Sequence, residues 1–413
     1  MRNAVPDSVI VEIDAAELGG ELVVGTLRRN RASGGSIIGF SYEQAWLDRP
    51  QRFALDPLHG LYAGDQWPRN GQIDPIFTDA GTDRWGRTLL DRREAVRARN
   101  EGRPRHRLDE WDYLLGVSDV GRMGALRMRT ADGVYLDQSS GVPPMARLPR
   151  LVAAARAVER QTGDIGQEAR DLAILVAPGS SLGGARPKAS FVDEHGALWM
   201  AKFPSRTDSR DMAACEWVLN ELAAAAGIEV PEHRLLEIGR GHRTFAAKRF
   251  DRLDGSRRMY ASAMTMVSRR DREPASYLDI ALAIADYGAS GSIEVLLETL
   301  YRRVAFNIVM SHRDDHLRNH GFLREVSGWH LAPAFDLNPM PEKPEHELAI
   351  DAANHTGDLE LLIETADYYR LAPSDAERIV DEVRTAVSAW EGIAAAANLG
   401  PDEMDTIREA IAA

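Results

Sequence analysis

The segment SHRDDHLRNHGFL, residues 311–323, gathers three histidines, two consecutive aspartates and an asparagine. His312, His316 and His320 recur every four residues, a spacing that would place them on one face of a helix. At a rise of ~1.5 Å per residue the outer two would lie roughly 12 Å apart, too far to share a zinc ion that binds at about 2 Å. Neither an HExxH motif nor a pair of CxxC motifs accompanies them. The aspartates and the asparagine therefore call for another chemistry.

The order His312-Arg313-Asp314, followed by Asn319, matches the H-R-D-x-x-x-x-N pattern of the protein-kinase catalytic loop. In that pattern the aspartate accepts the proton of the attacking hydroxyl group, and the asparagine holds Mg²⁺. The match predicts that Asp314 is a catalytic base and that Asn319 is a metal ligand.

A second metal ligand is expected at Asp336. Residues 320–333 read as a β-hairpin, and Asp336 follows it at the place where kinases carry another Mg²⁺-binding aspartate. The local sequence is FDLNP instead of DFG, so the match is one of position, and a lone aspartate often only caps a turn. His316 would bind a phosphate, brace Asp336, or pack as a hydrogen-bonded core residue.

A lysine and a glutamate upstream fit the same chemistry. Lys202 ends a predicted strand, ALWMAKFP, and Glu216 lies on the apolar side of a predicted helix that starts after Ser209 and ends before Gly227. A carboxylate in such a place needs a cationic partner. We expect Lys202 to pair with Glu216 and to reach the phosphates of a nucleotide, although a lysine at a strand end is often only solvent-exposed.

The stretch PGSSLGGARPK, residues 178–188, is a Gly/Ser-rich loop before a predicted strand. Its free main-chain N–H groups suit an oxyanion, but it lacks the Lys and Ser/Thr of a Walker A motif, and a plain surface turn explains it equally well. From the order of the elements, main-chain groups of about Lys248 to Phe250 would meet the adenine base.

The composition restricts the class of protein. The chain has 413 residues, 44% of them hydrophobic and 27% charged, and its one cysteine, Cys215, excludes a disulfide framework. We see no secretory signal or membrane-spanning run, and we expect a cytoplasmic protein. The net charge of −13 argues against direct binding to nucleic acid. The Arg-rich stretch 91–107 is interpreted as a solvated helix face, with an acidic partner as the alternative.

The pattern of elements predicts an α+β protein. Short strands and Gly-rich turns fill residues 1–135, with one helix around residues 84–99; residues 136–150 form a Pro/Gly/Ser-rich linker, and another helix follows at 148–162. The region 151–413 would be a two-lobed, protein-kinase-like domain, with a strand-rich lobe over about 165–270 and a helical lobe over about 271–413.

Several motifs in the same order resemble the HipA family, the serine/threonine kinase toxins of bacterial type II toxin–antitoxin pairs. FALDPLHGLYAG, DRWGRTLLDRREA and YLLGVSDVGRMGALRM resemble the N-terminal accessory domain of the family. GGARPKASF, WMAKFPS, ACEWVLNELAAAAGIEVP, KRFDR, RDDHLRNHGFL and LAPAFDLNP resemble its kinase domain. The chain departs from the family in detail, because His312 and Arg313 stand where Asn and Thr are commoner.

The resemblance implies a Mg²⁺-ATP-dependent kinase with Lys202 as the ATP lysine and Asp314 as the base. It also implies that Ser181 is autophosphorylated, with Ser180 as the second choice and a plain loop serine as the alternative; the added charge would refold the loop. The residues expected around the nucleotide are Ser181, Gly183, Gly184, Ala185, Arg186, Lys202, Lys248, Phe250 and His316.

The resemblance further implies a helix-turn-helix antitoxin, HipB-like, through which the chain would reach DNA indirectly, and a protein substrate such as an aminoacyl-tRNA synthetase. Two alternatives remain at this point. One is a catalytically inactive kinase-like module that only binds such an antitoxin, and the other is a metal-dependent hydrolase built on the His/Asp cluster.

Overall fold

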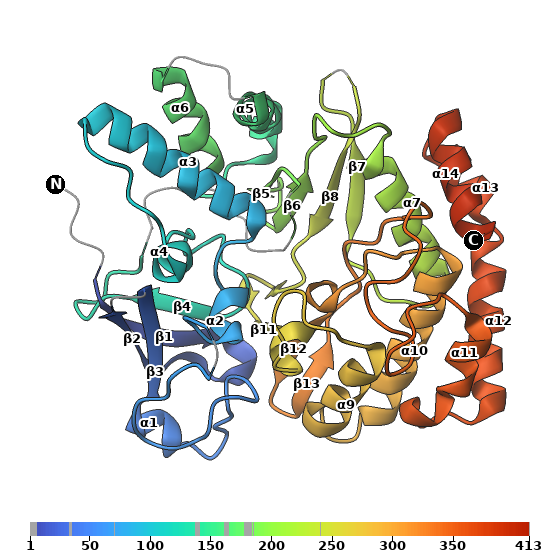
Figure 1. Ribbon diagram of the computed structural model, residues 1–413, viewed down its shortest axis with the longest axis horizontal. Coiled ribbons are helices and arrows are strands. Elements are labelled where there is room, and N and C mark those ends of the chain that lie inside the picture. Colours follow the sequence, from blue (N-terminus) through green and yellow to red (C-terminus); the bar gives the residue numbers. More distant parts are fainter. Residues whose placement is uncertain are drawn as a thin grey trace. The chain divides into compact units, whose positions relative to one another are not determined.

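The computed structural model describes residues 6–32, 35–69, 71–136, 141–160, 165–176, 184, 186–239 and 241–412 (Figure 1). The chain divides into two compact units. Unit 1 contains residues 1–206 and 251–261, and unit 2 contains residues 207–250 and 262–413. The predicted domain boundaries at residues 135 and 151 remain predictions, because compact units need not coincide with domains.

Unit 1 begins with a four-stranded antiparallel sheet in the order β3-β2-β1-β4. Apolar residues alternate along the strands, which buries one face, as at Val9, Val11 and Ile13. This confirms the strands that the alternating pattern predicted. Their bounds are β1 (Ser8–Ala15), β2 (Gly20–Ala32), β3 (Gly35–Tyr42) and β4 (Leu126–Arg129).

Helices and two hairpins complete unit 1. The predicted helices at 84–99 and 148–162 are present as α3 and α5. The helices are α1 (Gln44–Leu47), α2 (Pro75–Asp79), α3 (Arg84–Glu101), α4 (Glu110–Leu115), α5 (Leu148–Arg160) and α6 (Ile165–Val176). The remaining strands are β5 (Lys188–Val192), β6 (Leu198–Lys202), β9 (Arg252–Leu253), β10 (Ser256–Arg257) and β11 (Met259–Ser262).

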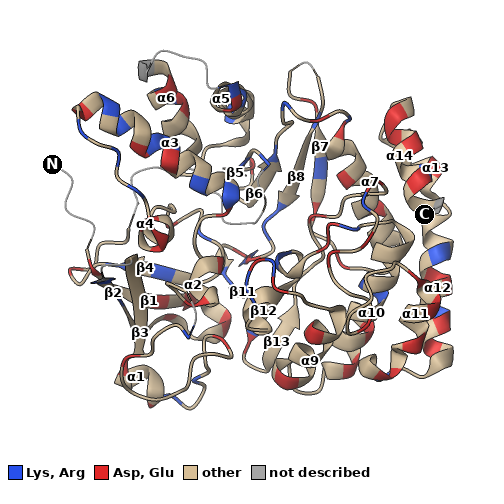
Figure 2. Cartoon of the chain, in the orientation of Figure 1, with Lys and Arg blue, Asp and Glu red and all other residues tan. Residues whose placement is uncertain are grey.

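The Arg-rich stretch 91–107 runs from α3 into the loop before α4, and the ribbon of α3 carries both blue (Lys, Arg) and red (Asp, Glu) positions (Figure 2). Arg103 binds both oxygens of Glu94 at 2.6 and 3.1 Å, Arg105 binds Asp91 at 2.9 Å, and Arg99 of α3 binds Glu168 of α6 at 2.8 Å. These arginines thus pair with carboxylates of the chain itself, and the interpretation of a solvated helix face stays a prediction.

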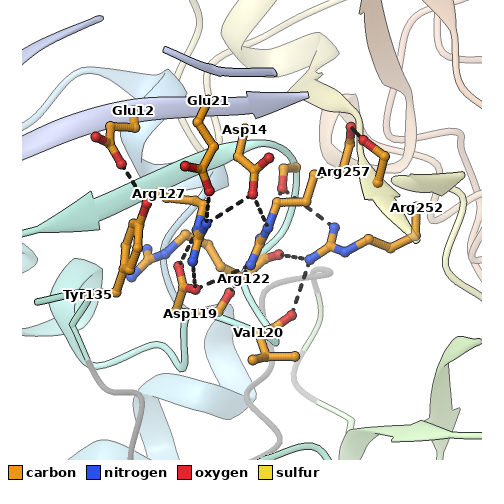
Figure 3. A network of polar contacts seen from close by, with 12 residues as sticks. Glu12, Asp14, Glu21, Asp119, Val120, Arg122, Arg127, Tyr135, Arg252 and Arg257 are labelled. Atoms are coloured by element: carbon orange, nitrogen blue, oxygen red, sulfur yellow. Dashed lines mark hydrogen bonds and ion pairs between the residues drawn. The ribbon is translucent and has the colours of Figure 1, made fainter. Parts of the chain in front are cut away.

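A network of charged side chains attaches the β9–β10 hairpin to the N-terminal sheet (Figure 3). Arg127 of β4 binds both carboxylate oxygens of Asp119, at 2.7 and 3.2 Å, and reaches Asp14 of β1 at 3.0 Å. Arg257 of β10 donates to the main-chain oxygen of Asp119 at 2.7 Å, and Arg252 of β9 donates to that of Arg122 at 2.9 Å. Residues 251–258 thereby belong to unit 1, although about 120 residues separate them from Arg127.

Unit 2 is mainly helical. The apolar residues of α12 recur at Ala376, Ile379, Val380, Val383 and Val387, a 3.6-residue period that buries one face. The helices are α7 (Met212–Ala225), α8 (Ala263–Met266), α9 (Tyr277–Tyr287), α10 (Ile293–Val309), α11 (Leu359–Glu364), α12 (Pro373–Val387), α13 (Trp390–Ala396) and α14 (Pro401–Ala412).

Two hairpins lie in unit 2, β7 (His233–Leu236) with β8 (Thr244–Lys248) and β12 (Gly321–Glu325) with β13 (Gly328–Leu331). The second is the hairpin predicted over residues 320–333. Gly328, at its turn, has φ +148°, and a Cβ there would lie 2.4 Å from the Cα of Ala289. Only glycine fits that position, so the hairpin is pressed against the end of α9.

One detail of the predicted α7 helix is wrong. Ser209 was expected as its N-cap, but the helix starts later, and Asp211 is the N-cap, accepting from the main-chain N–H of Ala214 at 3.1 Å. Asp211 is also held by Arg243 at 2.7 Å, so tertiary contacts fix this end of the helix. Among the residues that the structure describes, no helix is long and apolar enough to cross a membrane.

Candidate active site

The predicted catalytic loop connects α10 to β12 within unit 2. Ser311 ends the helix with a left-handed backbone, φ +45°, and its hydroxyl donates to the main-chain oxygen of Ala410 at 2.7 Å. A 3-10 turn, Leu317–Asn319, leads into the strand. Both ends of the loop are therefore fixed by regular structure, which suits residues that must hold a geometry.

Asp315 is buried and anchors the loop from within. Its Oδ2 accepts from the hydroxyl of Tyr277 at 2.7 Å and from Nδ2 of Asn307 at 2.8 Å, and it lies 2.7 Å from Nε2 of His320. Burial alone would raise the pKa of Asp315, but the charge and hydrogen bond of His320, with further help from His312 and Tyr277, hold that pKa below its ordinary value. The carboxylate stays ionised and is committed to structure.

Asp314 has the opposite environment. Its side chain is 48% exposed, and its Oδ1 forms an ion pair with Nζ of Lys343. Its main-chain oxygen accepts from Nδ2 of Asn319 at 3.3 Å. Of the two consecutive aspartates, Asp314 is the more accessible one, and its role as the base stays a prediction.

His312 connects the loop to the segment that carries Asp336. Its Nδ1 lies 2.8 Å from the main-chain oxygen of Asn338, and its Nε2 lies 3.7 Å from Oδ1 of Asp315. Nδ2 of Asn338 in turn donates to the main-chain oxygen of Asp336 at 3.2 Å. The histidine of the motif thus fixes the spacing between the catalytic loop and the predicted second metal ligand.

Asp336 has a left-handed backbone, φ +62°, a conformation that is uncommon outside glycine but tolerated by aspartate. Such positions often occur at functional sites, where surrounding contacts hold the strained backbone. The preceding residue, Phe335, packs its ring 5.3 Å from that of Phe250, measured between centroids. Phe250, one of the predicted adenine contacts, therefore lies beside the Asp336 segment within unit 2.

The donor set fits Mg²⁺. Because Nδ2 of Asn319 is bonded to Asp314, its Oδ1 faces away from that main-chain oxygen, and Asp336 offers a carboxylate. Mg²⁺ bound together with a triphosphate needs only one or two protein ligands of this kind. Across the described ranges, no group of three or more His, Cys, Asp or Glu side chains could hold a metal ion.

The remaining histidines of the motif differ from one another. His320 is 3% exposed and hydrogen-bonded to Asp315, as an ordinary packed histidine is. His316 is half-buried, its main-chain oxygen accepts from the N–H of Asn319 at 2.8 Å, and its buried Nδ1 has no hydrogen-bond partner in the described part of the chain. A contact between His316 and a phosphate stays a prediction.

The predicted nucleotide-binding residues of unit 1 lie around the β5–β6 hairpin. Lys202, at the end of β6, is half-buried and paired in register with Lys188 of β5, whose Nζ binds the buried Asp83 at 3.2 Å. Gly184 has φ +86°, and its main-chain oxygen accepts from the N–H of Trp85 at 3.3 Å. The base of the loop therefore rests against the start of α3.

Several predicted contacts are not tested by these observations. Glu216 is 3% exposed on α7 of unit 2, and its pairing with Lys202 stays a prediction. Lys248 is exposed and lies 3.3 Å from Glu232, and Arg186 is half-buried. Ser180, Ser181, Gly183 and Ala185 lie outside the described residues.

Sequence reasoning missed two parts of this site. The motif singled out two consecutive aspartates without showing that one would be buried, and a polar residue on the apolar side of α10, Asn307, was the available signal. No pattern pointed to Lys343, which lies 29 residues after its partner Asp314.

Comparison with known structures supports the fold. The HipA chain in a Shewanella oneidensis MR-1 complex of HipA, HipB and operator DNA matches with a TM-score of 0.65 at 14% sequence identity, covering 95% of this chain and 94% of that one. This match confirms the predicted α+β class and kinase-like fold. The proinflammatory kinase CtkA of Helicobacter pylori matches at 16% identity, covering 55% of this chain and 93% of that one. Its TM-score of 0.39 is too low to indicate a shared fold.

A comparison with curated protein sequences found no match. The model of the HipA-like C-terminal domain, in contrast, matches residues 180–390, just over half of the chain. The chain therefore belongs to the HipA-like family.

Proposed function

We propose that this chain is a Mg²⁺-ATP-dependent serine/threonine protein kinase of the HipA toxin type. The observation that carries the proposal is the contrast between the two aspartates of the loop. Asp315 is locked by Tyr277, Asn307 and His320, and this lock presents the half-exposed carboxylate of Asp314 at a fixed place.

Phosphoryl transfer requires the protein mainly to position the reactants and to stabilise negative charge. Asp314 would accept the proton of a serine or threonine hydroxyl group as that oxygen attacks the γ-phosphorus. Lys202 and the loop over residues 181–187 would hold the triphosphate. Asn319 and Asp336 would hold Mg²⁺, which when bound neutralises charge on the phosphates.

We propose a binding partner and a substrate for this chain by analogy with its family. The Shewanella relative was solved in a complex with HipB and operator DNA. By analogy we propose a helix-turn-helix antitoxin for this chain, so that an acidic protein with a net charge of −13 would reach DNA through its partner. The substrate would be a cytoplasmic protein such as an aminoacyl-tRNA synthetase, and Ser181, with Ser180 as second choice, would be autophosphorylated.

The test is incubation of the purified chain with γ-labelled ATP and Mg²⁺. Wild type should incorporate phosphate, and Asp314→Asn should lose at least about 100-fold in rate while binding ATP nearly as well. Asp271→Asn is the matched control, because Asp271 is exposed and contacts the same loop through Arg318 at 2.9 Å. Phosphopeptide mapping then locates the modified serine.

Two outcomes would contradict the proposal. Wild-type rates in Asp314→Asn would remove the base assignment. No incorporation by wild type with Mg²⁺ or Mn²⁺ would favour a catalytically inactive module that acts through its antitoxin.

A further inference from the structure

Lys343 is the cation that contacts the predicted base. Its Nζ forms the ion pair with Oδ1 of Asp314, and the two side chains are 36% and 48% exposed. One carboxylate oxygen is thereby engaged by an ammonium group, and the other remains for a second donor. An exposed ion pair by itself contributes little to stability. The pair of Lys343 and Asp314 differs because the main chain around Lys343 is held in place.

The main chain around Lys343 is bonded to the catalytic loop at four places. The N–H of Met340 donates to the oxygen of Ser311 at 2.9 Å, and the N–H of Glu347 donates to that of Arg313 at 3.0 Å. Nη1 of Arg313 donates to the main-chain oxygens of Pro341 and Lys343, at 3.1 and 2.5 Å. Arg313 thus holds the main chain of Pro341 and Lys343, and the side chain of Lys343 contacts Asp314.

The local sequence also restricts the backbone. Lys343 lies in the run PMPEKPE, between Pro341 and Pro344. Proline fixes its own φ and restricts the residue before it, so Lys343 has few backbone conformations to lose. Because this segment is restricted, we expect the side chain of Lys343 to stay beside Asp314 and not to move away from it during the reaction.

We propose that Lys343 is a further catalytic residue of the phosphoryl transfer, an inference that rests on the proposed kinase function. While its ammonium orients Oδ1 of Asp314, the other carboxylate oxygen accepts the proton of the substrate hydroxyl group. The hydroxyl oxygen forms a bond to the γ-phosphorus, the bond from that phosphorus to the bridging oxygen breaks, and its electron pair leaves with ADP. Lys343 stays protonated throughout, and its two other N–H groups donate to the oxygens of the transferring phosphoryl group.

The geometry of in-line attack would bring the ammonium group of Lys343 close to the transferring phosphoryl group. A hydroxyl group hydrogen-bonded to Asp314 stands about 3 Å from it, and the phosphorus lies ~3 Å beyond the attacking oxygen. An ammonium group already bonded to the same carboxylate lies at the edge of this path. Donors placed where charge develops in the transition state typically change kcat by about 100-fold to 1,000-fold each.

The test compares Lys343→Met and Lys343→Arg with wild type in the labelled-ATP assay, measuring kcat and KM for ATP separately. We expect Lys343→Met to lower kcat about 100-fold with KM changed less than about threefold, and Lys343→Arg to recover at least about a tenth of the wild-type kcat. Glu342→Gln is the matched control, because Glu342 is the preceding residue and contacts Arg210 at 3.1 Å, away from Asp314. Circular dichroism melting of each variant shows whether it is folded.

The outcomes separate the inference from the proposed function. An inactive wild type removes both. An active wild type with an equally active, folded Lys343→Met removes the inference alone, and a faster Lys343→Met overturns it in favour of an inhibitory contact. Should Lys343→Met fail to fold, Lys343→Arg decides: recovered activity supports a cationic role, and a folded but inactive arginine variant contradicts it.

Discussion

Asp314 and Asp315 are neighbours in the chain, yet the carboxylate of Asp314 is half-exposed and that of Asp315 is 2% exposed with three hydrogen-bonding groups around it. This difference in exposure indicates that the two aspartates have different roles. The buried aspartate holds the loop, and the exposed one is available to a substrate.

Substitution of the two aspartates should therefore separate stability from activity. Asp315→Asn should lower the free energy of unfolding by about 3 kcal/mol, because an amide cannot satisfy three donors in a buried site. Asp314→Asn should change it by less than ~0.5 kcal/mol, as expected of a surface position. Urea denaturation followed by circular dichroism measures both, and equal stability losses in the two variants would contradict the assignment.

Arg127 is predicted to hold the β9–β10 hairpin on the N-terminal sheet (Figure 3). Arg127→Met leaves the carboxylate of Asp119 without its bidentate partner and should destabilise unit 1 by about 3 kcal/mol. Arg127→Lys should rescue little, because an ammonium group cannot reproduce the two parallel hydrogen bonds. Hydrogen exchange of residues 252–257 should accelerate in both variants, and unchanged exchange would show that the hairpin is held by other contacts.

His59 should make unit 1 less stable at alkaline pH. It is buried between Asp56, 2.9 Å from Nδ1, and Asp74, 3.2 Å from Nε2. Burial would lower the pKa of His59, but the hydrogen bond to Asp56 and the negative charges of Asp56 and Asp74 outweigh it and raise the pKa to about 9. Because the folded value exceeds the unfolded one, the stabilisation is complete below pH ~6.5 and is lost as the pH rises through 9.

The measurement for His59 is the unfolding free energy of wild type and His59→Gln at pH 6 and pH 9.5. The difference between them should shrink by up to about 3 kcal/mol at the higher pH. His195→Gln serves as control for the substitution itself, because the His195 side chain is 79% exposed in the same unit. A pH-independent difference would show that folding does not raise the pKa of His59.

His346 should act in the opposite direction in unit 2. It is 3% exposed, neither ring nitrogen has a hydrogen-bond partner among the described residues, and burial lowers its pKa to about 4. The folded value lies below the unfolded one, so the stabilisation is present above pH ~6.5 and is lost as the pH falls toward 4. Wild type should lose up to about 3 kcal/mol more than His346→Leu between pH 7 and pH 4.5, measured by urea denaturation. Parallel losses in the two proteins would contradict this.

Local patterns predicted much of the fold. Alternating residues located β1, β2 and β3, because one face of the sheet is buried. The H-R-D spacing singled out the segment between α10 and β12, because a loop that does chemistry needs particular residues at particular steps along the chain, and the catalytic role of this segment stays a prediction.

What the sequence could not predict depends on partners far apart along the chain. Asp315 is buried because Tyr277 and Asn307 surround it, and Lys343 reaches Asp314 because Arg313 holds its main chain. Ser209 was expected as the α7 cap, because a local rule ignores Arg243, which holds the actual cap Asp211 from another segment. No spacing rule covers such contacts.

We propose that Lys202, Asp314, Asn319 and Asp336 bind the same nucleotide together with its metal ion. The most direct measurement is a crystal structure of the chain with Mg²⁺ and a non-hydrolysable ATP analogue. We predict that Lys202 contacts the phosphates, that Asn319 and Asp336 ligate the metal, and that Asp314 faces the γ-phosphate. A nucleotide bound elsewhere, or one that these four side chains do not surround, would contradict the account.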